Sequence, residues 1–112
     1  MATPIETIGK VTLHQKAWVV AKLQFVYLEG SVWKHVDGSG GTALGQSVTC
    51  DPGDYGVPNG AQFAVYVFVV WGNDRQGREV FRYEKGNTRT ASYTLTGTTL
   101  DASLSFDGIT NA

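Results

Sequence analysis

The sequence predicts a single all-β domain over residues 1–112, an antiparallel β-sandwich of the immunoglobulin or fibronectin-III type with roughly seven to eight strands. Short segments that alternate apolar and polar residues recur along the chain, and turn-forming residues separate them at intervals of about eight to twelve residues. The intervals leave no room for the crossover helices that parallel βαβ units need. A chain of 112 residues also has the length of one ordinary domain.

Composition narrows the classes of function. The net charge of −1 removes the simplest argument for nucleic acid or an anionic membrane as a partner. The single cysteine, Cys50, cannot form a disulfide within the chain. The start of the sequence lacks the charged and apolar regions of a signal peptide, which predicts a cytoplasmic protein, or one released without a signal peptide.

The predicted strands cover residues 9–13, 17–28, 31–36, 42–50, 61–71, 78–84, 88–96 and 98–106.

The first half of the chain contains one long strand. In residues 17–28 every odd position is apolar, whereas the even positions mix Trp18 with Lys22 and Gln24. A turn at Glu29-Gly30 leads to the short strand 31–36. A glycine-rich loop, the weak strand 42–50 and the irregular connection 51–60 follow.

Residues 61–71 form the most apolar run, with glycine at each end. Eleven extended residues would span roughly 36 Å, and β-branched and aromatic residues dominate the run. Both faces are apolar, which predicts a central strand with a core on one side and a second covered surface on the other.

The last third of the chain predicts hairpins. The polar turn formers of residues 72–77 lead into strand 78–84, and a turn at Gly86-Asn87 precedes strand 88–96. Residues 88–96 and 98–106 then alternate cleanly around a break at Gly97. Each of these two strands has one apolar face and one face of threonine, serine and aspartate.

The second apolar face of strand 61–71 predicts self-association, because a sandwich has only one core and large apolar patches usually mark a contact surface. We therefore expect a homo-oligomer. The predicted interface residues are Tyr66, Phe68, Val70 and Val80.

Aromatic residues beside polar loops predict ligand binding. A sugar face requires a flat apolar surface with directional polar groups near it. The predicted ligand-binding residues are Trp33, His35, Asp51, Asp54, Tyr55 and Asn59. The partner would be a glycan or a cell-surface protein. Core positions in opposite sheets are the alternative for Trp18 and Trp33.

No catalytic constellation is evident. His14 and His35 are the only imidazole groups, and neither lies in a nucleophile motif. A Cys50–His35 pair is conceivable, but a small buried side chain at a strand end is the simpler interpretation of Cys50. We predict no enzyme, no catalytic residue and no cofactor.

A metal site is not predicted either. Asp51, Asp54 and Asn59 share one loop and offer oxygen ligands for calcium, yet Asp-Pro-Gly-Asp is also common turn chemistry.

Residues 17–27, Ala-Trp-Val-Val-Ala-Lys-Leu-Gln-Phe-Val-Tyr, resemble the opening of fungal immunomodulatory proteins, which carry an A-W-x-V-x-K-L-x-F-x-Y run. Residues 55–57 and 67–70 resemble the Y-G-I and V-F-V-V runs of that family. The resemblance implies a released, dimeric sandwich that binds sugars or cell surfaces. It covers about a fifth of the chain and assigns no functional residue.

The sequence thus predicts a non-enzymatic, lectin-like or cell-surface-interacting protein that acts as a homo-oligomer. One alternative is a self-assembling structural subunit that repeats an apolar face or pairs exposed edges. The other is a small membrane-active toxin whose hairpin 88–106 inserts as a β-ribbon. A membrane is a partner only under that last alternative.

Overall fold

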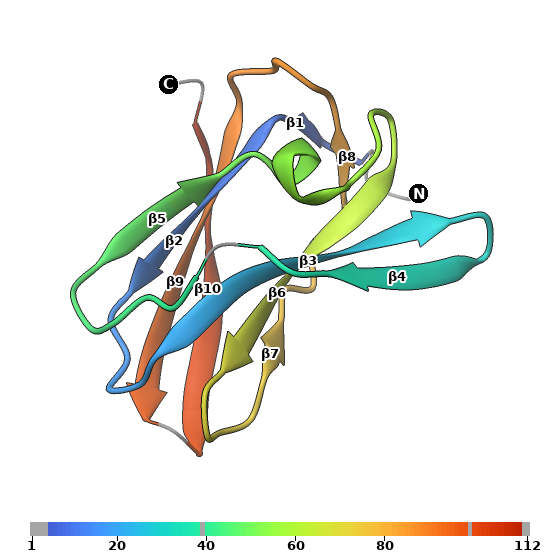
Figure 1. Ribbon diagram of the computed structural model, residues 1–112. Coiled ribbons are helices and arrows are strands. Elements are labelled where there is room, and N and C mark those ends of the chain that lie inside the picture. Colours follow the sequence, from blue (N-terminus) through green and yellow to red (C-terminus); the bar gives the residue numbers. More distant parts are fainter. Residues whose placement is uncertain (1–4, 39, 99, 111–112) are drawn as a thin grey trace.

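Two β-sheets pack face to face in the computed structural model, which describes residues 5–38, 40–98 and 100–110 (Figure 1). The larger sheet has the order β1-β8-β6-β3-β4, with β7 paired to β6. Its strands are β1 (Thr7–Ile8), β3 (Ala21–Glu29), β4 (Val32–Val36), β6 (Gln62–Val69), β7 (Arg75–Gln76) and β8 (Phe81–Tyr83).

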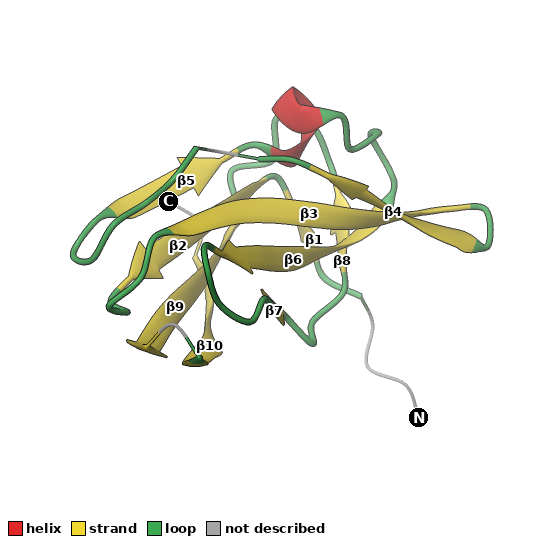
Figure 2. Ribbon diagram, turned by 60° about the horizontal axis from the view of Figure 1, so that its bottom comes forward, coloured by secondary structure: helices red, strands yellow, loops and turns green. Residues whose placement is uncertain are grey.

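The smaller sheet has the order β10-β9-β2-β5. Its strands are β2 (Lys10–Gln15), β5 (Ser47–Cys50), β9 (Thr90–Thr98) and β10 (Asp101–Thr110). The short 3₁₀ helix η1 (Pro52–Tyr55) follows β5. Figure 2 shows the two sheets as separate layers, with η1 at the end opposite the β9–β10 turn.

The all-β prediction is confirmed, but the purely antiparallel arrangement is wrong. Strand β1 runs parallel to β8, and β2 runs parallel to β9. Each sheet therefore contains both parallel and antiparallel pairs. The parallel pairs join the N-terminal strands to partners that lie more than half the chain away in sequence. Alternation of side chains is the same in parallel and antiparallel strands, so the sequence pattern could not reveal this. The immunoglobulin or fibronectin-III type is not confirmed.

The core lies between the sheets, and the predicted alternation places its residues correctly. The odd positions of β3, the apolar face of β9 and one face of β6 are buried. Phe63 lies at the centre of an aromatic cluster: its ring centroid is 5.9 Å from those of Phe25 and Phe81 and 6.3 Å from that of Tyr83. The fully buried core residues include Leu13, Leu23, Val65, Val67, Tyr93 and Leu95.

Several predicted boundaries are wrong where the chain changes direction. Residues 17–20 form a loop instead of the start of a strand, because the chain crosses there from β2 in one sheet to β3 in the other. Of the predicted strand 42–50, only Ser47–Cys50 is a strand. Strand β9 continues through Gly97, whose φ of 99° allows a close approach to Asp101, and β10 extends to Thr110.

We expect Phe63→Ala to lower the free energy of unfolding by about 3–5 kcal/mol, because it empties the centre of the aromatic cluster. Phe68 lies on the same strand but on the outer face, so Phe68→Ala should cost less than about 1 kcal/mol. Urea denaturation with comparable m-values measures both. Equal losses for the two variants would contradict the assignment of the inner face.

Candidate functional site, an apolar tip formed by three loops

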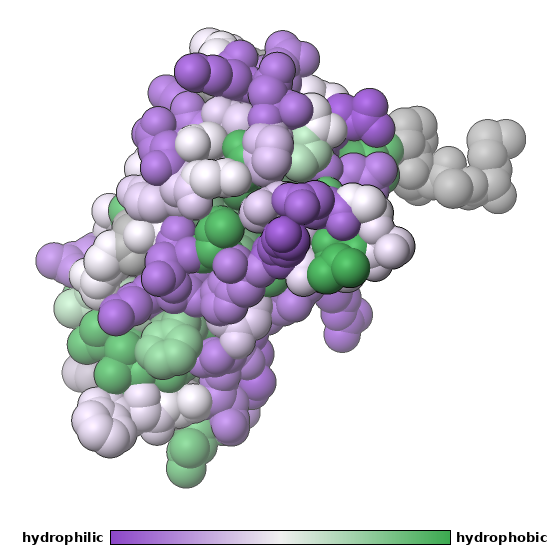
Figure 3. All heavy atoms as spheres, turned by 45° about the vertical axis from the view of Figure 1, so that its right-hand side comes forward, coloured by the Kyte–Doolittle hydropathy of each residue, from purple (hydrophilic) through white to green (hydrophobic). Residues whose placement is uncertain are grey.

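Three large apolar side chains stand out into solvent at one end of the sandwich. The exposed fractions are 75% for Trp18, 92% for Trp71 and 72% for Leu100. They lie on three connections, between β2 and β3, between β6 and β7, and between β9 and β10, all at the lower end of Figure 1. We call these three residues and their loops the tip. In Figure 3 one group of apolar residues lies in the lower left part of the molecule, and smaller apolar areas lie in the middle and at the right of the same face.

Backbone hydrogen bonds hold the three loops together. The Trp18 amide donates to the Gly97 carbonyl at 2.9 Å, which joins the first loop to β9. The Val70 amide donates to the Val20 carbonyl at 2.9 Å. The tip is therefore a connected platform that includes strands of both sheets.

The third link joins the second loop to the β9–β10 turn. Asn73 Nδ2 donates to the Leu100 carbonyl at 3.4 Å, and Arg75 Nε donates to the Ala102 carbonyl at 2.6 Å. Each of the three connections is thus hydrogen-bonded to the other two, directly or through the end of β9.

The backbone at Trp71 is strained. Its φ of 63° is the only positive value at a non-glycine residue in the described part of the chain, and bulky residues rarely adopt it. Asp74 fixes this turn: Oδ1 accepts from the Val69 amide at 3.0 Å and Oδ2 accepts from the Tyr66 hydroxyl at 2.5 Å. Strain of this kind persists only where the surroundings enforce it, and it concentrates at functional sites.

The Tyr66–Asp74 bond is stable over the physiological pH range. The hydrogen bond to Asp74, together with partial burial, raises the pKa of Tyr66 to about 12. The hydroxyl therefore keeps its proton and continues to donate to the carboxylate that organises the Trp71 loop.

A buried glutamine organises the first loop. Gln15 is fully buried, and its Nε2 donates to the carbonyls of Val19, at 2.6 Å, and Thr42, at 3.2 Å. Its Oε1 accepts from the Ala17 amide at 2.6 Å. One side chain thus satisfies the backbone of the crossing between the sheets and ties it to the segment before β5.

The charges beside the tip are balanced. Lys16 and Asp101 are both exposed and carry opposite signs, while Arg75 and Asp74 are occupied by the contacts described above. This end of the molecule thus offers apolar surface without an excess of either charge.

The predicted ligand-binding residues divide into two groups. Trp33 and His35 lie on the edge strand β4; His35 Nε2 is 2.6 Å from Gln24 Oε1, and its ring centroid is 4.6 Å from that of Tyr66. His35 is paired with Val26, on the outer face of the larger sheet. Tyr55 instead has its ring centroid 6.2 Å from that of Phe25. Phe25 and Val26 are successive residues of one strand and face opposite sides, so the two groups do not form one site.

Of the remaining predicted residues, Asp51 and Asn59 form hydrogen bonds within the fold. Asp51 caps η1, where Oδ1 accepts from the Gly53 amide at 2.9 Å and also from the Tyr83 hydroxyl. Burial, then the bond to Asp51, raises the pKa of Tyr83 to about 12. Asn59 Oδ1 accepts from the Lys85 amide at 2.9 Å. Asp54 is exposed on η1. Ligand binding by these residues stays a prediction.

The predicted interface is also divided. Tyr66 and Phe68 lie on the outer face of β6, and Val70 begins the Trp71 loop. Val80 lies elsewhere, in a groove with Phe106 and Ile109. The interface role of all four residues stays a prediction.

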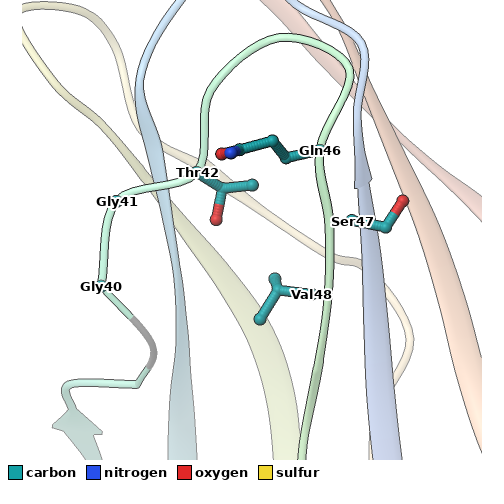
Figure 4. Close-up of a pocket in the computed structure, with 6 residues that line it drawn as sticks. All are labelled: Gly40, Gly41, Thr42, Gln46, Ser47 and Val48. Carbon is teal, nitrogen blue, oxygen red and sulfur yellow. The ribbon is translucent and has the colours of Figure 1, made fainter.

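A hollow of about 480 Å³ lies beside β5 and is lined by Gly40, Gly41, Thr42, Gln46, Ser47 and Val48 (Figure 4). None of these side chains titrates, so the hollow offers no acid or base.

Across the described ranges, no group of three His, Cys, Asp or Glu side chains is placed to hold a metal ion. In the same residues, no helix has the length and hydropathy needed to cross a bilayer.

The sequence matches no protein-family model and no curated protein. The structure is similar to that of the membrane-binding domain of pneumolysin, with a TM-score of 0.51 and 14% identity, over 89% of this chain and 96% of that domain. It is also similar to listeriolysin O and to pneumolysin, both with a TM-score of 0.51, at 16% and 15% identity.

The chain covers 22% of the listeriolysin O chain and 24% of the pneumolysin chain. These neighbours are pore-forming toxins of the cholesterol-dependent cytolysin class and not enzymes. At such low identity the likeness shows the fold alone. No sequence match supports the resemblance of residues 17–27 to fungal immunomodulatory proteins.

The tip was missed at the sequence level because two of its three residues continue an apolar pattern, and Trp18 was placed in the predicted strand 17–28. Trp71 ends the predicted strand 61–71, and Leu100 fits the inward face of strand 98–106. One signal was present: Trp71 directly precedes the turn formers Gly72-Asn73-Asp74, and connecting loops run over the protein surface.

We expect Gln15→Leu to lower the free energy of unfolding by about 2–4 kcal/mol, because the Ala17 amide and the Val19 carbonyl lose their partner in a buried place. Hydrogen exchange at the Ala17 amide should accelerate. Gln46→Leu is the matched control: it removes only an exposed bond, of 2.8 Å, between Oε1 and the Ala43 amide, and should cost less than about 1 kcal/mol. Similar losses for both variants would argue against the role of Gln15.

Proposed function

We propose that this domain binds membrane surfaces by inserting the tip into the interface between headgroups and hydrocarbon. The observation that carries the proposal is the exposure of Trp18, Trp71 and Leu100, at 75%, 92% and 72%, on three loops bonded to one another. Tryptophan favours the membrane interface because its ring is apolar and its N–H is polar. The strained backbone at Trp71, which keeps this ring in solvent, supports the same role.

The likeness to the membrane-binding domain of pneumolysin supports the proposal, because it extends over 96% of that domain. It favours the membrane-active alternative of the sequence analysis over the lectin-like one. The mode of contact differs from the predicted hairpin insertion. Ala91, Tyr93 and Leu95 of β9 are buried in the core, so insertion of the whole hairpin would open the sandwich. We assign the contact to the β9–β10 turn and its two neighbouring loops.

The strength of such a contact can be bounded. Burial of a large apolar side chain contributes about 2 kcal/mol, so three contribute about 6 kcal/mol. That corresponds to a dissociation constant between about 1 mM and 1 μM. A single copy would therefore bind reversibly, and several linked copies would hold far more tightly.

We further propose that the protein associates through the outer face of the larger sheet. Phe68 is 37% exposed there, on the same face of β6 as Tyr66. Association on this face would leave the tip free. A glycan-binding site around Trp33 and His35 stays a separate prediction, as does a structural self-assembling role.

The three tryptophans allow a sharp test of the tip. Binding is measured by flotation with vesicles of phosphatidylcholine, with and without cholesterol, and by the blue shift of tryptophan emission. Trp71→Ala and Leu100→Ser should each weaken binding about tenfold or more. Trp33→Ala, the matched control on the edge strand, should change it less than about twofold. Because charges at the tip balance, salt should have little effect. Absence of vesicle binding, or an equal loss in Trp33→Ala, would refute the proposal.

The outer face is tested by light scattering after size exclusion at high micromolar concentration. We expect the unaltered chain to be a dimer or larger, and Phe68→Lys to be a monomer, because it sets a second cation beside Lys22, whose Nζ lies 5.8 Å from the Phe68 ring centroid. Ser103→Lys, on the exposed face of the other sheet, should leave the molar mass of the oligomer in solution unchanged. A monomeric parent protein would contradict association through this face.

A further inference from the structure

A groove of about 420 Å³ runs along the edge of the sandwich beside β10. Its walls are mainly apolar and come from Ile5, Val80, Phe81, Phe106 and Ile109. The volume lies within the range of about 300–1,000 Å³ that small-molecule sites occupy. We call it the β10 groove.

The groove exists because the larger sheet is incomplete at this edge. Strands β7 and β8 have two and three residues, whereas β10 opposite them has ten. The residues between β7 and β8 lie outside the ladder, so part of the inner face of β10 has no strand across from it.

A β-bulge enlarges the apolar floor. The register of β10 on β9 shifts between Phe106 and Gly108, so that Phe106 pairs with Tyr93 and Ile109 pairs with Ala91. Without the bulge, Phe106 and Ile109 would face opposite sides, because they are three residues apart. With it, both share the face of the buried Tyr93 and Ala91. Phe106 is nevertheless 38% exposed, although its ring centroid is 5.8 Å from that of Phe81.

Of the three charged side chains that line the groove, Glu6 and Glu79 have partners within the described residues. The carboxylate of Glu79 accepts from the Tyr93 hydroxyl at 2.9 Å, and Glu6 forms an ion pair with Arg89 at 2.8 Å. The third charged residue that lines the groove, Arg78, is exposed, and within the described residues its guanidinium has no hydrogen-bond or ion-pair partner. Arginine binds carboxylates with two parallel hydrogen bonds.

We propose that the β10 groove binds a single-chain amphiphile with a carboxylate head, that is, a fatty acid. The aliphatic chain would lie on Phe106, Ile109 and Val80, and the carboxylate would pair with Arg78. This site is separate from the tip: six residues of extended chain, roughly 20 Å, separate Leu100 from Phe106. The proposal therefore stands whether or not the tip binds membranes.

The test is isothermal titration calorimetry of the full chain with decanoate below its critical micelle concentration. Decanoate should bind, acetate should not, and decyltrimethylammonium should bind at least about tenfold more weakly, because it reverses the head charge. Arg78→Gln should weaken decanoate binding about tenfold or more. Arg82→Gln, an equal loss of charge on an exposed residue of β8 outside the groove lining, should change it less than about twofold.

Two further measurements locate the ligand. Val80→Trp should abolish binding by filling the groove, provided that urea denaturation shows an intact fold. In amide NMR spectra decanoate should shift the signals of Val80, Phe106 and Ile109, and leave the indole signals of Trp18 and Trp71 in place. No decanoate binding, equal binding by Arg78→Gln, or shifts confined to the tip indoles would each overturn the proposal.

Discussion

The arrangement of the tip depends on the hydrogen bonds that the buried side chain of Gln15 forms with the backbone. The chain must pass from the smaller sheet to the larger one directly after β2, and a crossing of this kind leaves backbone groups without ladder partners. Burial of such groups without hydrogen bonds costs several kcal/mol. Gln15 supplies partners to Ala17, Val19 and Thr42 from a fully buried position. The crossing is therefore compact, and Trp18 in its middle points away from the core instead of into it.

The second constraint is the turn after β6. Trp71 has a positive φ, and Asp74 holds the turn through the Val69 amide and the Tyr66 hydroxyl. Tyr66 itself belongs to the outer face of the larger sheet, where its ring contacts that of His35. The sheet face that we assign to association and the loop that we assign to membrane contact thus share one hydrogen-bonded chain. A change on that face has a physical route to the orientation of the Trp71 loop.

The three proposed surfaces occupy different parts of one small sandwich. The tip uses the ends of strands from both sheets, association uses the outer face of the larger sheet, and the β10 groove uses the edge that short strands leave open. None of the three requires catalytic groups. What each requires is apolar area left outside the core, and a rigid β scaffold provides it by ending or shortening strands at defined positions.

Sequence alone determined the all-β class and most of the core. Two-residue alternation identified the buried faces of β3, β6 and β9, because successive side chains of a strand must point to opposite sides. Alternation carries no information on which strands pair or where a strand leaves its sheet. Those depend on contacts such as the parallel pairing of β2 with β9, or Gln15 with Thr42, between residues far apart in the chain. Tertiary structure alone therefore decided that Trp71 and Leu100 are exposed, that they meet Trp18 at one end, and that Val80 lies in a groove.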